Sequence, residues 1–188
     1  MEVSAYVKAT TNSKGYCTLV NSNALKISDA TAYYATDNGD GSATAVTITY
    51  PAKNTPMLIK GENGTDYFFE VNSDAGIDVS GSNAFKAGNG TVYSTDGSNY
   101  NYVLNGDAFY LAKSTGTTVA SGKAYLQLSQ QASAGARVLR FADDETQGIN
   151  AISTVKAADG AYYNLSGQRV NAPVKGLYIH NGKKMIVK

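Results

Sequence analysis

"YNYVLNGDAFYLA", residues 100–112, predicts two strands joined by a tight turn. Aromatic and β-branched residues flank the pair Asn105-Gly106, and such a pair supplies the two positive-φ positions of a type I′ hairpin turn. The same signal recurs along the chain, as Asn-Gly at 38–39, 63–64, 89–90 and 181–182 and as Asp-Gly at 40–41, 96–97 and 159–160. Short apolar runs between such turns predict an all-β fold, an antiparallel β-sandwich or, alternatively, a β-barrel.

The composition fits a β protein with a polar, weakly charged surface. Of the 188 residues, 43% are hydrophobic and only 16% are charged, against roughly 25% charged in an average domain. Ser, Thr, Asn and Gly must therefore cover much of the surface, which suits an extracellular or cell-surface protein. A net charge of +1 gives no reason to expect a nucleic-acid partner. No run approaches 18 apolar residues, so no membrane span is expected.

Changes in character along the chain predict three parts. Residues 1–141 are expected to form the antiparallel β domain, within which Pro51 and Pro56 bracket a crossing loop. The segment 142–151 contains three consecutive acids and is interpreted as a linker. Residues 152–188 are expected to form a small C-terminal β-meander. From residue 150 onward six basic residues accompany one acidic residue, whereas the preceding part has 10 basic and 14 acidic residues.

The last hairpin has a register that its turn dictates. A two-residue turn at Asn181-Gly182 pairs His180 with Lys183, and it also makes three further pairs, Ile179 with Lys184, Tyr178 with Met185 and Leu177 with Ile186. Both faces of this hairpin then carry apolar residues, so we expect both to be covered. "AYYNLS" is the expected third strand, followed by "GQR" as the turn.

The closing sequence "YYNLSGQRVNAPVKGLYIHNGKKMIVK", residues 162–188, resembles the C-terminal segment shared by many surface and secreted proteins of Bacteroidales. The shared positions are Tyr163, Asn164, Leu165, Gly167, Arg169, Val170, Lys175, Gly176, Tyr178, Ile179, Asn181, Gly182, Lys183 and Lys184. "YPAKNTPMLIKG", "SGKAYLQL" and "DDETQGIN" are also similar to segments that precede such tails. The tail is similar, too, to the C-terminal sorting domains read by the type IX secretion system.

This resemblance implies a module on the outer surface of a Gram-negative bacterium, as the C-terminal part of a larger exported protein, and we expect the module to be non-enzymatic because the sequence lacks a catalytic constellation. It implies outer-membrane export or attachment machinery as a partner. The implied sorting or anchoring residues are Gly167, Arg169, Lys175, Gly176, Tyr178, Asn181, Gly182, Lys183 and Lys184. The lysines have a simpler interpretation as solvated residues that protect an exposed sheet edge.

A carbohydrate-binding or adhesive domain is the first alternative function, with glycans or a host surface as partners. Tyr100 and Tyr102 share one face of a predicted strand, and Asn99 and Asn101 share the other. Paired tyrosines beside amides can form a platform on which a sugar stacks. Packing of the same rings inside the sheet is the competing interpretation.

The sequence shows no catalytic constellation, and no cofactor or metal site is expected. A glycoside hydrolase, the second alternative, would need a cleft that pairs two of Asp66, Glu70 and Asp96. Glu62 is a further acid near the same predicted hairpin, although a turn flanked by solubilising acids explains it equally well. Cys17 is expected to be a buried thiol and His180 a turn residue, and no family signature supports a Cys17–His180 dyad.

The stretch "DNGDGS", residues 37–42, alternates carboxylate and amide side chains with glycine, as calcium loops do. The EF-hand pattern nevertheless fails, because glycines occupy ligand positions and Ile48 stands where the final Glu belongs. We therefore predict a turn here, without a metal.

Overall fold

The computed structural model describes residues 5–141, 162–164, 169–170, 175–180 and 183–187. The chain forms two compact units, residues 1–144 and 145–188, and each is treated by itself. The described residues contain strands and turns and no helix. The predicted linker at 142–151 lies outside the described residues.

A five-stranded sheet, here called the central sheet, organises the first unit. Its strands follow the order β15-β5-β4-β6-β2. Their bounds are β2 Tyr16–Leu19, β4 Thr31–Asp37, β5 Ala43–Thr47, β6 Met57–Lys60 and β15 Leu139–Phe141. The pairs within β5-β4-β6-β2 are antiparallel, but β15 pairs with β5 in parallel, with Leu139 opposite Ala43. This edge is thus a parallel exception within a sheet whose other pairs are antiparallel, as expected.

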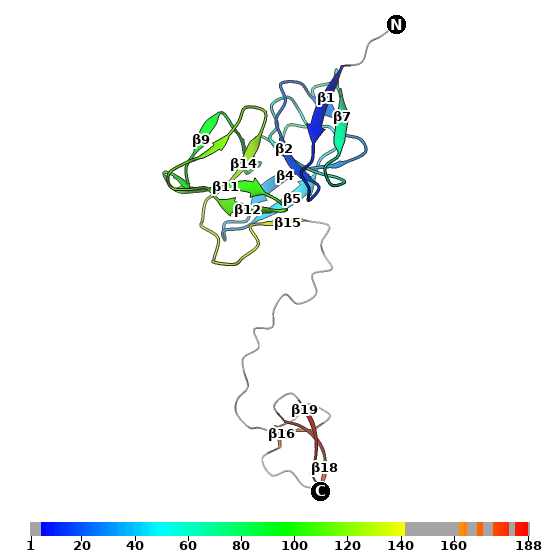
Figure 1. The fold of residues 1–188 in the computed structure, drawn as a ribbon, viewed down its shortest axis with the longest axis vertical. Coiled ribbons are helices and arrows are strands. Elements are labelled where there is room, and N and C mark those ends of the chain that lie inside the picture. The colour runs from blue at the N-terminus through cyan, green and yellow to red at the C-terminus, as the bar shows by residue number, and fades with distance from the viewer. Residues whose placement is uncertain (1–4, 142–161, 165–168, 171–174, 181–182, 188) are drawn as a thin grey trace. The chain divides into compact units, whose positions relative to one another are not determined.

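Three further sheets complete the first unit (Figure 1). The N-terminal sheet has the order β1-β7-β3, with β1 Tyr6–Thr10, β3 Leu25–Lys26 and β7 Asp66–Val71. The outer sheet has the order β10-β11-β14-β8, with β12 also paired to β11. Its bounds are β8 Phe85–Ala87, β10 Thr95–Asp96, β11 Asn99–Asn105, β12 Ala108–Leu111 and β14 Ala124–Leu128. A two-stranded ribbon joins β9 Gly90–Val92 to β13 Thr117–Val119.

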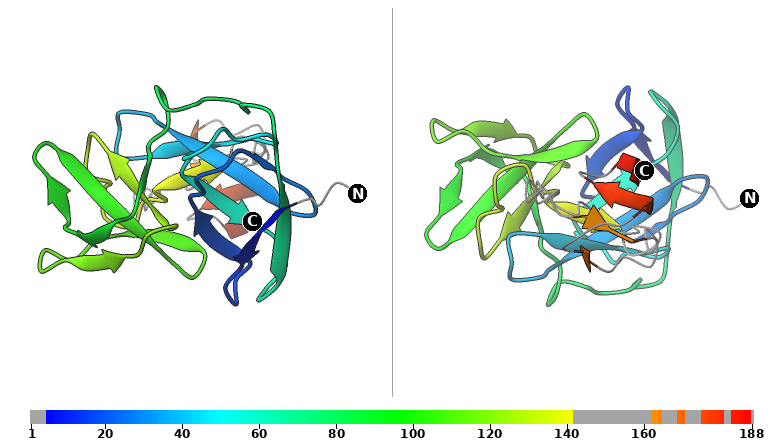
Figure 2. Two further views of the ribbon diagram at one scale, coloured as in Figure 1. Left: turned by 90° about the horizontal axis from the view of Figure 1, so that it is seen from above. Right: turned by 90° about the horizontal axis from the view of Figure 1, so that it is seen from below.

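Both faces of the central sheet are buried, and each faces a different neighbour. On β6, Leu58 belongs to the cluster that includes Phe85 and Leu126 of the outer sheet. Its neighbours Met57 and Ile59 point the opposite way and join the cluster that includes Phe69 of the N-terminal sheet. The predicted all-β sandwich is confirmed. In Figure 2 the strands of the outer sheet, drawn in green, lie beside the strands of the central and N-terminal sheets, drawn mainly in blue and cyan.

The turns differ from the predicted type. A type I′ turn needs a positive φ at both central residues. At the Asn-Gly and Asp-Gly pairs of the described residues, the glycine has a positive φ and the preceding Asn or Asp does not. Asn105 pairs directly with Ala108, so Gly106 and Asp107 are the central residues, and Gly106 has φ +67. Glycine with positive φ at the first central position is typical of a type II′ turn.

The second unit contains one four-stranded antiparallel sheet, the C-terminal sheet, in the order β17-β16-β18-β19. Its bounds are β16 Tyr162–Tyr163, β17 Arg169–Val170, β18 Gly176–His180 and β19 Lys183–Val187. The predicted register of the last hairpin is confirmed, from His180 opposite Lys183 to Leu177 opposite Ile186.

Three features of this sheet depart from expectation. Because β16 lies between β17 and β18, the strands do not follow one another as in a simple meander. Arg169 lies in β17 and not in the turn. Within this unit Leu177 and Ile186 are 39% and 71% exposed, so the other strands of the C-terminal sheet do not cover these two side chains.

Candidate functional site

The tyrosines predicted to form a sugar platform face the core. Tyr102 is only 3% exposed and belongs to the cluster between the outer and central sheets, against which Tyr100 also packs. The Ala132 backbone N–H donates to the Tyr102 hydroxyl at 2.7 Å. Since a stacking platform must expose its rings, this pair is corrected to a packing role at the β11 strand.

The amides on the opposite face of β11 also serve the fold. Asn101 is 3% exposed, and its Nδ2 donates to the Tyr93 carbonyl at 3.0 Å. Gln127 Nε2 donates to Asn101 Oδ1 at 3.0 Å. Asn99 is half-buried and pairs with Asp96 across a two-residue turn. A buried amide with both ends bonded holds neighbouring strands together and offers little to a ligand.

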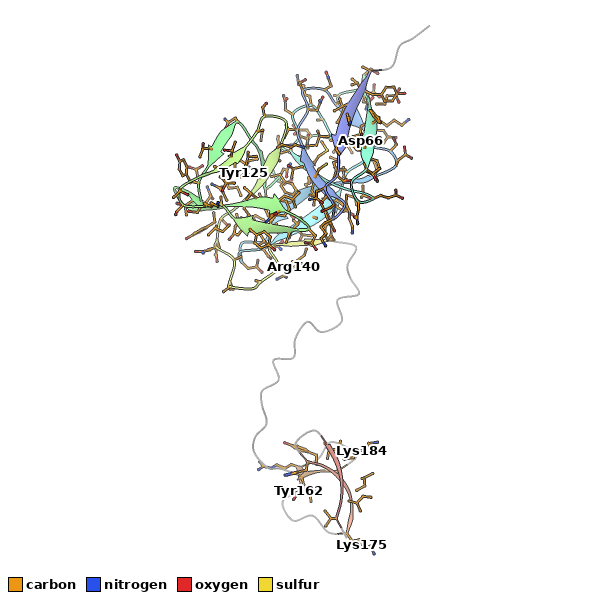
Figure 3. All side chains as sticks on the ribbon, in the orientation of Figure 1. Asp66, Tyr125, Arg140, Tyr162, Lys175 and Lys184 are labelled. Atoms are coloured by element: carbon orange, nitrogen blue, oxygen red, sulfur yellow. The ribbon has the colours of Figure 1, made fainter. Side chains whose placement is uncertain are left out.

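The acids considered for hydrolysis are spread over two sheets. Asp66 accepts a hydrogen bond from Thr10 Oγ1 at 2.6 Å and lies 2.7 Å from Lys8 Nζ. These two contacts lower the pKa of Asp66 below its ordinary value. Glu70 lies on the same strand β7, whereas Asp96 lies on β10 of the outer sheet, the sheet that carries Tyr125 in Figure 3. None of the three lines the two large cavities described below.

The loop 38–42 is a turn between β4 and β5 whose carboxylates bond to backbone groups. Asp37 accepts hydrogen bonds from the backbone N–H groups of Gly39 and Ser129, at 2.9 and 2.8 Å. Asp40 accepts from both the N–H and the hydroxyl of Ser42, at 2.9 and 2.6 Å. The carboxylates are thus engaged with the chain itself, and the predicted turn is confirmed.

These bonds predict acid sensitivity. Burial raises the pKa of Asp37, but the hydrogen bonds from Gly39 and Ser129 outweigh it, so this pKa lies below its ordinary value of 3.8. A carboxylate whose pKa is lower in the folded state stabilises the fold above its unfolded value, and that contribution is lost on acidification. The free energy of unfolding should therefore fall as the pH drops below about 4.

Urea denaturation at pH values between 7 and 3, followed by far-UV circular dichroism, measures this effect. The variant Asp37→Asn should be less stable than the wild type at pH 7 and should lose less stability on acidification. Asp107→Asn, at an exposed aspartate in the turn between β11 and β12, serves as the matched control. Equal pH dependence of Asp37→Asn and the wild type would contradict the assignment.

Cys17 and His180 lie in different units. The thiol of Cys17 is free and buried, as predicted. Burial raises the pKa of this thiol, which the charge of Lys123 only partly offsets, so the thiolate needed for nucleophilic chemistry is disfavoured. His180 lies on β18, and its ring stacks on that of Tyr162 at 4.4 Å between centroids.

The tail residues implied by the resemblance form part of the C-terminal sheet. Arg169, Lys175 and Lys184 are exposed, and Figure 3 marks Lys175 and Lys184 towards opposite ends of the β18–β19 hairpin. Gly176, Tyr178 and Lys183 lie within β18 and β19. Gly167, Asn181 and Gly182 lie outside the described residues.

The first unit also contains a cavity that sequence reasoning missed, here called the polar cup. Its volume is about 620 Å³, within the range of about 300–1,000 Å³ typical of ligand pockets. It is lined by residues 22–24, 52–56, 72–76, 78, 80 and 83. Of the cavity wall, only the crossing loop 52–55 between Pro51 and Pro56 was identified from the sequence.

A second cavity of about 470 Å³, here called the aromatic groove, lies between the outer and central sheets. The rings in its wall belong to Tyr16, Tyr102, Phe109, Tyr110 and Phe141. Phe141 contacts Tyr33 edge to face at 5.0 Å, and Lys60 Nζ lies 4.7 Å from its ring centre. The buried residues of this wall, Leu58, Tyr102, Phe109, Val138 and Leu139, belong to the core between the two sheets, and the residues on its outer side are exposed.

The chain matches no family model, no curated protein and no solved structure. Within the part of the chain that the structure describes, no helix has the length and apolar character needed to cross a membrane.

Proposed function

We propose that this chain is a non-enzymatic β module of an exported bacterial cell-surface protein, with the C-terminal sheet as its sorting or anchoring tail. The observation that carries the proposal is the compact second unit, 145–188, whose sequence resembles Bacteroidales sorting tails. A tail that forms its own compact unit can be recognised by the export apparatus independently of the domain that precedes it.

The surface of the C-terminal sheet supports recognition by a protein partner. Leu177 and Ile186 form an exposed apolar cross-strand pair, which gives a partner an apolar surface to bury. The exposed cations Arg169, Lys175 and Lys184 would complement an acidic partner surface. The outer-membrane export or attachment machinery is the partner that we propose.

Deletion of residues 167–188 tests the proposal in the native host. We expect the truncated protein to be lost from the cell surface and from the medium and to accumulate inside the cell, as measured by fractionation and immunoblotting. A finer variant, Leu177→Ser combined with Ile186→Ser, should reduce export while changing only the exposed apolar pair.

Two controls make the result interpretable. Leu111→Ser alters a comparably exposed leucine (38%) in the first unit and should leave export unchanged. Protection of the buried Cys17 thiol from alkylation would show that the first unit of each variant is still folded. Normal export of the deletion variant would refute the sorting role.

A further inference from the structure

We infer that the polar cup binds a neutral, hydroxyl-rich ligand, an oligosaccharide, with Tyr50 as a stacking surface at its rim. The inference concerns the 1–144 unit and does not depend on the sorting role proposed for the tail. It places carbohydrate binding at residues other than the β11 tyrosines that the sequence had suggested.

Backbone hydrogen bonds hold the loops of the cup in fixed positions. Asn54 N–H donates to the Asn21 carbonyl at 2.7 Å, and Asn72 N–H donates to the Ala24 carbonyl at 2.9 Å. Ala52 N–H donates to the Ile77 carbonyl at 3.0 Å. Three loops that are distant in sequence are thereby joined, so a ligand would meet a preformed site and the entropy cost of binding would be small.

Close packing at Gly76 adds to this rigidity. Gly76 has φ +74, and a Cβ at this position would lie 2.8 Å from Ala52 N and from the Pro51 carbonyl oxygen. Only glycine combines this conformation with such a close approach of two backbones. Below the cup, the buried Asn83 donates from Nδ2 to the Pro56 carbonyl at 2.8 Å and accepts from Phe85 N–H at 3.0 Å.

The side chains of the wall are available for binding. Asn23, Lys53, Asn54 and Asp74 are exposed, and within the described residues their side chains make no hydrogen bond or ion pair. Amide and ammonium groups donate, and carboxylate and amide oxygens accept. A sugar hydroxyl can both donate and accept a hydrogen bond, so neighbouring hydroxyls of one sugar ring can bond to these donors and acceptors together.

The balance of charge favours a neutral ligand. The cup contains one cation, Lys53, and two anions, Asp74 and Asp78. A shallow depression that shares Asn72, Asp74 and Gly76 with the cup adds Lys26 and Tyr50. The positive and negative side chains are therefore equal in number, so neither a phosphate-rich ligand nor a cation gains a net attraction.

Tyr50 supplies the apolar surface that a sugar needs. Its side chain is 44% exposed, while its carbonyl accepts a hydrogen bond from Ile77 N–H at 2.6 Å, which fixes the backbone below the ring. A tyrosine presents a flat apolar face and a polar hydroxyl in one rigid group. The C–H face of a pyranose ring can therefore pack on Tyr50 while its hydroxyls reach the cup.

A glycan array probed with the purified full-length chain tests the inference, using bacterial, plant and host oligosaccharides. Titration calorimetry with the best array oligosaccharide then measures affinity. We expect Tyr50→Ala and Asp74→Asn each to weaken binding at least tenfold. Tyr93→Ala removes a comparably exposed tyrosine (54%) outside the cup and should leave affinity unchanged.

Three outcomes would overturn the inference. The first is the absence of binding to any oligosaccharide on the array by a chain whose circular dichroism shows it to be folded. The second is sugar binding that is not located in the cup. Such binding would survive in the Tyr50→Ala, Asp74→Asn double variant, or it would be lost in Tyr110→Ala, and the latter result would place the site in the aromatic groove. The third is a thermal shift with calcium chloride alone that Asp74→Asn abolishes, without binding of any sugar. All three use purified protein, so they are independent of any failure of export.

Discussion

Phe69→Ala is expected to lower the free energy of unfolding by about 3–5 kcal/mol, the usual cost of removing a fully buried phenylalanine side chain. Phe69 is 0% exposed, stacks on Tyr67 at 6.3 Å between ring centroids, and belongs to the cluster between the N-terminal and central sheets. Since the chain has 14 tyrosines and no tryptophan, far-UV circular dichroism and tyrosine fluorescence in urea are suitable measurements.

The neighbouring residue provides the control. Phe68 lies on the same strand with its side chain on the other face, 57% exposed. Phe68→Ala should therefore change the free energy of unfolding by no more than about 0.5 kcal/mol. Equal effects of the two substitutions would contradict the assignment of β7 faces, because a shift of one residue exchanges the buried and exposed positions.

Gly41→Ala is expected to destabilise the first unit by about 2–5 kcal/mol, through two additive causes. Gly41 has φ +80, a conformation that costs a residue with a Cβ about 1–2 kcal/mol. A Cβ here would also lie 2.5 Å from the Gln131 carbonyl oxygen and 2.7 Å from Ala132 Cα, and relieving such overpacking typically costs about 1–3 kcal/mol.

Gly39 separates these two causes, because it shares the conformation and not the crowding. It has φ +73 and no heavy atom within 4 Å of an added Cβ. Gly39→Ala should therefore cost only the conformational part, about 1–2 kcal/mol. If both alanine variants unfolded at the same urea concentration, the packing of the 38–42 turn against the 131–132 segment would be refuted.

The features that were predicted correctly from the sequence are determined by residues that lie close together along the chain. The register of β18 and β19 followed from the length of the turn between His180 and Lys183. The all-β class followed from the spacing of turns and from the absence of a helical apolar period. The burial of Cys17 followed from its place in a strand-like run.

The turn types could not be predicted from the Asn-Gly and Asp-Gly pairs alone. Asn-Gly chemistry allows several turns, and the choice depends on which residues face each other across the hairpin. Asn105 faces Ala108, which moves Gly106 into the first central position. Similarly, alternation along β11 placed Tyr100 and Tyr102 on one face, but only packing against the central sheet determined that this face is buried.

The polar cup could not be predicted because its walls are brought together by tertiary structure. Its loops lie near residues 23, 54 and 74, and each resembles an ordinary surface loop when considered alone. The bonds that join them are between backbone groups, which leave almost no trace in the side-chain sequence.

The parallel pairing of β15 with β5 has a consequence for the order in which the protein can be completed. Leu139 and Val138 are both 7% exposed and contribute to the core, although their partner strand lies some 95 residues earlier in the chain. Contacts of such large sequence separation form slowly, because a long loop must close first. A nascent chain released only as far as residue 130 would therefore present the β5 edge unpaired. During that interval the edge would be open to chaperones, to proteases and to a second nascent copy of the same strand.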